Sequence, residues 1–269
     1  MAWSIARQAP KLVAAAVDVV QKPGTGLVVL IYHRVGRRSA IEVDLPLATF
    51  TEQIAFLAAH TEVVTLADGL ARVADEHAPR DPIVAITFDD GTADFAELAV
   101  PVLVEHRVPA TIYVATDFLE RGREFPGGGT PLSWRALADT LATGVVDVGS
   151  HTHQHALLDR LPEPEIAGEL DRSIELIGER TGHVAEHFAY PKALPGSPAA
   201  EAAVRARFRS ATLAGTRANR YCATDPFRVA RSPIQVSDGM RWFRHKAAGG
   251  LAFEDTLRRA IRRHPGGTT

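Results

Sequence analysis

The hydrophobic pattern of the chain alternates short apolar runs with longer amphipathic stretches. The run Ile83–Phe88 is short, β-rich and bounded by Pro82 and Gly91, which predicts a strand buried on both faces. Similar runs predict further strands at Leu27–His33, Ala110–Val114, Val145–Gly149 and Ser210–Leu213. Helical periodicity predicts helices at Phe50–Leu57, Asp94–Glu105 and Pro164–Thr181. This alternation favours an α/β fold in a single domain, for which a barrel of this length is ordinary.

The N-terminal stretch predicts a helix outside the barrel. Residues 1–20 carry Arg7, Lys11 and Asp18, and their longest uncharged run is too short for a signal peptide or a membrane span. We expect an N-terminal helical segment at residues 1–24, followed by a barrel domain at residues 25–269. The helix would lie on the barrel or, alternatively, on a membrane surface. The protein is therefore expected to be cytoplasmic, without stable membrane insertion.

Composition agrees with one large domain. With 269 residues, 46% of them hydrophobic, the chain can bury a sizeable core. The net charge of −2 provides no extended basic field and argues against a dedicated nucleic-acid-binding protein. A basic patch at Arg258–Arg263 is interpreted as the solvated face of a C-terminal helix. The single cysteine, Cys222, excludes an intrachain disulfide and is predicted to be a buried or neutral thiol. Nothing in the pattern predicts an oligomeric state.

Two adjacent carboxylates follow the predicted strand Ile83–Phe88. Barrels and open parallel sheets keep their chemistry at the C-terminal ends of their strands, where Asp89 and Asp90 would lie. Side chains alternate along a strand, so one carboxylate can bind a cation while the other faces the substrate water. Gly91 allows the chain to turn immediately. The alternative is a polar turn whose aspartate caps the next helix.

Three of the eleven histidines lie within five residues, after the predicted strand Val145–Gly149. Residues at i and i+4 share one face of a helical turn, so we predict that His151 and His155 reach the same ion. His153 falls off that face and would contact solvent or stand behind the ligands. The alternative is a polar surface loop. Together with the aspartates, these histidines are the parts of a metal hydrolase site.

These residues carry a family resemblance. Thr87-Phe-Asp-Asp-Gly91, followed by Ser150-His-Thr-x-x-His155, resembles the first two motifs of the polysaccharide deacetylases, the NodB-like group of carbohydrate esterases. The similarity extends from about Leu27 to about Pro233 and implies a distorted (β/α)7 barrel related to the TIM barrel. It also implies a divalent metal, most often zinc, with Asp89 as the general base toward a metal-bound water. The metal ligands implied by the motifs are Asp90, His151 and His155.

Other segments match the family only in part. Phe188-Ala-Tyr-Pro191 resembles the third motif, which implies that Tyr190 and Pro191 line the groove and that the N–H of Lys192 donates to the oxyanion. The position of the motif's usual arginine is occupied by Ala189, so the partner that orients Asp89 is not identified. The family's last motif supplies a histidine as general acid, but Ile234–Ser237 contains none.

An early histidine offers a substitute acid. Leu27–His33 resembles the Tyr-His-x-Val segment of the poly-N-acetylglucosamine deacetylases, in which strand order is permuted and this histidine is the acid. We therefore predict that His33 protonates the leaving amine, which its ordinary pKa of about 6.5 allows. The alternative is a rim histidine without a role.

Two further residues are candidates for substrate contact. Trp134 follows a Gly-Pro-rich loop and would stack on a sugar ring or belong to the core. Arg217 follows a predicted strand and would bind substrate hydroxyls or a phosphate, or belong to an ordinary loop.

The predicted function is metal-dependent removal of N-acetyl groups from an N-acetylated amino sugar or polysaccharide. The alternatives are an O-acetyl glycan esterase that uses the same site and an inactive carbohydrate-binding barrel. A cytoplasmic location favours a lipid- or nucleotide-linked sugar precursor as substrate.

Overall fold

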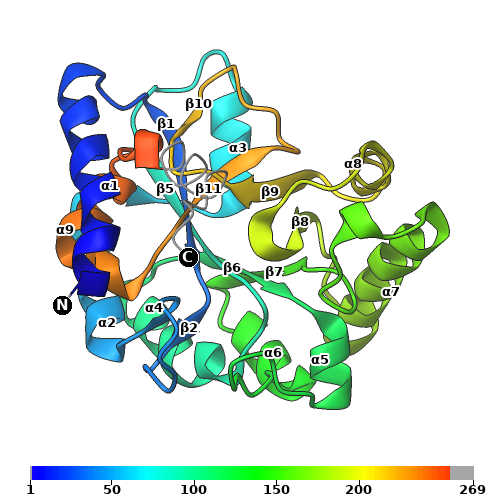
Figure 1. Ribbon diagram of the computed structural model, residues 1–269. Helices are drawn as coiled ribbons and strands as arrows, with labels where there is room; N and C mark the ends of the chain where they lie inside the picture. The colour runs from blue at the N-terminus through cyan, green and yellow to red at the C-terminus, as the bar shows by residue number, and fades with distance from the viewer. Residues whose placement is uncertain (1, 255–269) are drawn as a thin grey trace, which may run out of the picture.

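The computed structural model describes residues 2–254, and within this part of the chain seven parallel strands close into a barrel (Figure 1). Around the barrel the strands follow the order β1 (Gly26–Tyr32), β11 (Val229–Pro233), β9 (Ser210–Ala214), β8 (His187–Ala189), β7 (Val146–Ser150), β6 (Ala110–Val114) and β5 (Ile83–Phe88). β5 then pairs with β1, where residues 27–32 run in register with residues 83–88. The predicted (β/α)7-type barrel is confirmed.

Short strands extend the barrel at its rim. β4 (Glu62–Val63) pairs with β5 in parallel, and β10 (Asn219–Arg220) pairs with β1 in antiparallel orientation. β2 (Arg34–Val35) and β3 (Asp44–Leu45) form a separate two-stranded sheet. These additions leave the parallel barrel as the frame that positions the site.

Helices connect the strands and pack around the barrel (Figure 1). The α-helices are α1 (Ala2–Val20), α2 (Leu47–His60), α3 (Leu66–Ala74), α4 (Val100–His106), α5 (Thr116–Arg121), α6 (Trp134–Leu141), α7 (Glu163–Thr181), α8 (Pro198–Arg205) and α9 (Gly239–Ala247). A π-turn, η1 (Phe95–Ala99), leads into α4. Short 3-10 turns are η2 (Leu158–Arg160), η3 (Pro191–Ala193) and η4 (Val236–Asp238).

Side-chain alternation divides each barrel strand into two sets. On β1 and β5 every residue is buried, which explains their continuous apolar runs. Tyr32 and Phe88 face outward and stack at 5.3 Å between ring centroids within the layer between barrel and helices. The other set begins deep in the barrel with Leu27 on β1 and Ile83 on β5. Continued at every second residue, this set brings His33 and Asp89 to the same open end.

The N-terminal helix α1 packs beside α9, where Nε1 of Trp242 donates to Oε1 of Gln8 (Figure 1). The predicted helical segment is therefore present as α1, while a domain boundary at residue 24 stays a prediction. No helix within residues 2–254 combines the length and the apolar character needed to cross a bilayer.

Several predicted elements need correction. The segment Asp94–Glu105 is a π-turn followed by α4, because the chain widens by one residue per turn before Pro101 enters the first turn of the helix. Cys222 is exposed, so the prediction of a buried thiol is wrong. It lies in the turn after β10 with a left-handed backbone angle φ of 55°, and its Sγ donates to the carbonyl oxygen of Asp75 at 3.9 Å. The basic patch Arg258–Arg263 lies outside the described residues.

Candidate metal centre and active-site cleft

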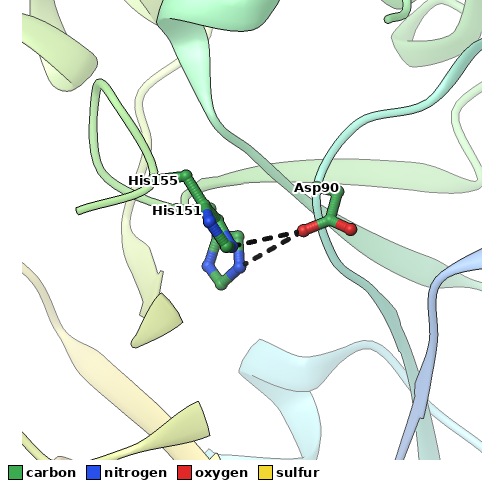
Figure 2. Close-up of side chains that lie close together, drawn as sticks. All are labelled: Asp90, His151 and His155. Carbon is green, nitrogen blue, oxygen red and sulfur yellow. Dashed lines mark ion pairs between the residues drawn. The ribbon is translucent and has the colours of Figure 1, made fainter. Parts of the chain in front are cut away.

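Three potential metal ligands meet at the C-terminal ends of the barrel strands. Asp90 follows β5, while His151 and His155 follow β7. Figure 2 shows both imidazoles directed at the carboxylate, with Oδ1 of Asp90 lying 3.7 Å from Nε2 of His151 and 3.5 Å from Nε2 of His155. All three ligand atoms lie within 4.8 Å of one another. Since Zn–N distances are about 2.0–2.1 Å, donors at this spacing can share one ion.

The two histidines do not lie on a helix, so the predicted helical turn is wrong. Residues 151–157 form an irregular loop in which Thr152 and His155 adopt left-handed φ angles of 63° and 59°. Oγ1 of Thr152 accepts a hydrogen bond from the N–H of Ala156 at 3.0 Å and holds the loop in this shape. The loop still brings the two rings to a centroid distance of 4.9 Å. The structure therefore brings His151 and His155 together without a helical turn, and their binding of one ion stays a prediction.

The groups around His151 and His155 leave a ring nitrogen of each histidine free to bind a cation. Nδ1 of His151 lies 2.7 Å from the carbonyl oxygen of Ala189, so this nitrogen carries the proton and Nε2 is left as a ligand. Burial and the neighbouring His151 lower the pKa of His155 to about 4, which keeps its ring neutral at neutral pH. Neutral imidazoles and a carboxylate form a donor set that fits a divalent cation.

His153 lies apart from this donor set. Its Nδ1 is 2.9 Å from Oγ1 of Thr116, and its Nε2 is 3.7 Å from Oδ1 of Asp117. Asp117 also pairs with Arg121 and Arg123. His153 therefore ties the ligand loop to α5.

Asp89 forms a buried ion pair with Arg231 of β11. Oδ1 of Asp89 accepts from Nη1 of Arg231 at 2.6 Å, and Oδ2 accepts from Nη2 at 2.8 Å. Burial alone would raise the pKa of Asp89, but the charge of Arg231 and the nearby His151 outweigh it and lower the pKa to about 2. The carboxylate is consequently ionised and fixed in orientation at neutral pH.

Arg231 is a residue of the candidate site that the sequence analysis did not single out. It is fully buried, donates from Nη1 to Oγ1 of Thr87 at 3.0 Å and lies over the ring of Tyr113. It occupies the role left open by Ala189, whose carbonyl oxygen instead orients His151. The available signal was an arginine in the middle of a strand whose other residues are small or apolar. Such a charge is buried only with a partner.

A cleft of about 570 Å³ opens at this end of the barrel. It is lined by Ile31, His33, Asp89, Asp90, His151, His155, Lys192, Ala193, Leu194, Pro195, Ala214, Pro233 and Gln235. His33 thus shares the cleft with Asp89 and the metal ligands. Its Nδ1 is buried and has no hydrogen-bond partner among the described residues. The described residues therefore leave one ring nitrogen of this cleft-lining histidine unpaired.

In the segment that resembles the third motif, Tyr190 and Pro191 are buried, whereas Lys192 lines the cleft. Tyr190 is 2% exposed, packs edge-on against Phe188 and has its pKa raised to about 12 by burial, while Pro191 is also buried. Lys192 adopts a left-handed φ of 55° and lines the cleft. Only Lys192 of these three reaches the cleft wall.

Trp134 and Arg217 lie outside the cleft lining found for residues 2–254. Nε1 of Trp134 donates to Oε2 of Glu120 at 2.8 Å, and the ring packs against the core. Arg217 is exposed in the loop before β10. Their contact with substrate stays a prediction.

The fold and the site define an α/β barrel with a candidate cation centre in a cleft at the C-terminal ends of its strands. The sequence profile of a family described as polysaccharide deacetylase matches residues 76–211, just over half of the chain. The chain therefore belongs to the polysaccharide deacetylase family, a family of deacetylase enzymes. No curated protein matches the chain.

Solved structures agree with this assignment. The structure of IcaB from Ammonifex degensii is 27% identical, with a TM-score of 0.72 over 82% of this chain and 98% of that chain. The Streptococcus pyogenes deacetylase PplD in complex with acetate is 16% identical, with a TM-score of 0.71 over 83% and 99% of the two chains. A de-N-acetylase from Aggregatibacter actinomycetemcomitans is 17% identical, with a TM-score of 0.66 over 82% and 99%. The last two similarities show the fold alone.

Proposed function

We propose that this protein is a metal-dependent hydrolase that removes N-acetyl groups from an N-acetylated amino sugar or glycan. The observation that carries the proposal is the convergence of the ligand set Asp90, His151 and His155 with the Asp89–Arg231 pair in one cleft. Hydrolysis of an unactivated amide needs an activated water, a base for its proton and an acid for the leaving nitrogen. The cleft contains a candidate residue for each of these tasks.

Asp90, His151 and His155 would hold the cation, for which zinc is the proposed identity because imidazole and carboxylate ligands suit it. When bound, such a cation supplies Lewis-acid polarisation of the acetyl carbonyl and lowers the pKa of a coordinated water. The residues of the chain supply the remaining steps.

Asp89 is proposed as the general base. Its carboxylate lines the cleft beside Asp90 and is held ionised by Arg231, so it can accept the proton that the water loses during attack on the acetyl carbon. The two hydrogen bonds from Arg231 leave other lone pairs of the carboxylate for this proton. Arg231 therefore fixes the base without occupying all of its acceptor capacity.

His33 is proposed to act on the leaving amine, and Lys192 on the oxygen that becomes negatively charged during attack. His33, at the end of β1, would donate a proton to the amine nitrogen as the C–N bond breaks. The backbone N–H of Lys192 would donate to the negatively charged oxygen of the tetrahedral intermediate. The products are acetate and a free amino sugar, so atoms and charges balance.

The test is acetate release from N-acetylglucosamine oligomers and from lipid- or nucleotide-linked analogues. We would compare metal-free protein, zinc-restored protein and the Asp89→Asn variant, which keeps the shape of the side chain. Turnover that requires zinc and is lost in the variant is the expected result. If an ester substrate turns over much faster than every amide, O-deacetylation would replace N-deacetylation as the proposed activity. Zinc binding without turnover of either class would overturn the proposal.

A further inference from the structure

One wall of the cleft is held from behind by a buried cluster of charges. Pro233 and Gln235 line the cleft at the end of β11. Nζ of Lys246, on α9, donates to the carbonyl oxygen of Pro233 at 2.6 Å and to Oδ2 of Asp238 at 2.8 Å. The same Oδ2 accepts from the backbone N–H of Gln235 at 2.7 Å. Both wall residues are thus attached to one carboxylate and one ammonium group.

The N-terminal helix α1 completes this cluster. Nζ of Lys11 donates to Oδ1 of Asp238, and both side chains are fully buried. One helical turn earlier, Nε2 of Gln8 donates to the carbonyl oxygen of Ser237 at 3.1 Å. A helix 227–229 residues away in sequence therefore contacts the wall segment at two points.

The cluster is well suited to fixing a backbone position. Burial would raise the pKa of Asp238, but Lys246 and Lys11 outweigh it and lower the pKa. Buried ion pairs add little to stability compared with apolar packing, because both partners lose their hydration. Their hydrogen bonds are directional, however, so they select one arrangement of the groups they join. Here the groups joined are the backbone atoms of the cleft wall.

We propose that Lys11, Asp238 and Lys246 form a positioning unit that holds the Pro233–Gln235 wall against the glycan, which makes α1 part of the substrate-binding apparatus. This inference rests on the proposed function. The unit acts through Pro233 and Gln235 on β11 and its following turn, whereas the metal ligands follow β5 and β7. Its loss should therefore weaken glycan binding and leave the cation site and the chemical step in place.

The test compares Lys11→Met with the unsubstituted zinc-loaded protein. We expect KM for an N-acetylglucosamine oligomer to rise about tenfold, as for residues that act through a connected network, with kcat within about twofold. Kinetics with 4-nitrophenyl acetate, which has no sugar to contact the wall, should not change. Arg207→Met is the matched control, because it deletes the ion pair between Arg207, in the turn after α8, and Asp171 on α7. Arg207→Met should leave KM and kcat unchanged for both substrates.

Hydrogen exchange gives a readout that does not depend on turnover. The backbone N–H groups of Gln235 and Asp238 should exchange faster in Lys11→Met, while those of the ligand loop His151–His155 should not. If Lys11→Met does not fold, Gln8→Ala removes the second contact of α1 with the wall and should show the same pattern at smaller amplitude.

The failures are distinguishable. An unsubstituted, zinc-loaded protein that releases no acetate from any acetylated substrate would overturn the proposed function. An active protein in which Lys11→Met keeps its KM, or in which kcat falls equally for oligomer and small ester, would overturn the positioning role alone.

Discussion

Replacing Arg231 by methionine tests the central electrostatic feature of the cleft. The substitution keeps an unbranched apolar stem but removes the guanidinium group and the charge that pairs with Asp89. Arg231 is 0% and Asp89 3% exposed, so bulk water compensates little for the lost partner. Breaking a buried pair in this way costs about 3–5 kcal/mol of unfolding free energy.

The pKa of Asp89 gives a second measure of how much the ion pair stabilises the fold, and it gives the direction in which this stabilisation changes with pH. A shift from 3.8 to about 2 corresponds to roughly 2 kcal/mol. In the unsubstituted protein this stabilisation is complete above the unfolded pKa and is lost as pH falls toward 2. Without Arg231, burial raises the pKa of Asp89, so the sign reverses and the buried carboxylate destabilises the fold increasingly as pH rises. The cost of Arg231→Met should therefore be larger at neutral than at acid pH.

The assay is urea unfolding of metal-free protein between about pH 5 and pH 7. Arg207→Met serves as the control, since its partly exposed ion pair with Asp171 should contribute about 0–1 kcal/mol at every pH. Adding Asp89→Asn to Arg231→Met should recover part of the lost stability, because the unpaired charge is removed. A cost no larger than that of the control, or one independent of pH, would refute the reasoning.

Three further predictions concern the ligands, the acid and a supporting strand. Asp90→Asn, which tolerates the left-handed φ of 77° at this position, should weaken zinc binding at least about tenfold in a chelator competition. His33→Gln should lower kcat about a hundredfold at unchanged zinc affinity. Gly149→Ala would place Cβ 2.6 Å from the carbonyl oxygen of His187, so it should lower the unfolding free energy by about 1–3 kcal/mol. Gly168→Ala, whose Cβ meets nothing within 4 Å, is its control and should be neutral or stabilising by up to ~1 kcal/mol.

Each of these predictions has a contrary outcome. Unchanged zinc affinity in Asp90→Asn would remove this carboxylate from the ligand set. Full kcat in His33→Gln would make it a rim histidine. Equal stability of the two alanine variants would show that β7 can shift away from β8.

The strands could be predicted because a strand that is buried on both faces consists mainly of apolar residues, which are visible in the sequence. The runs Ile83–Phe88 and Ala110–Val114 coincide end to end with β5 and β6, since strands buried on both faces are continuously apolar. The π-turn Phe95–Ala99 could not be predicted, because it carries the same apolar positions as an α-helix.

The site was predictable in residue type and less so in geometry. Asp90, His151 and His155 were identified because their motifs are compact in sequence. The conformation of the histidine loop was not, since left-handed φ angles at Thr152 and His155 are unusual for these residues. Arg231 escaped prediction because its proximity to Asp89 exists only after the barrel closes.

The barrel closes only after its last strand, β11, has been synthesised, and this delay affects how the chain folds. Arg231 lies 142 residues after Asp89, which corresponds to roughly seven to thirty seconds of ribosomal elongation. During that interval β1 lacks β11, its neighbour on one side, and the growing sheet presents open edges that can pair with other chains. Asp89 meanwhile lacks its counterion. We expect chaperone supply and slow translation to govern the yield of active protein more strongly than the stability of the finished barrel does.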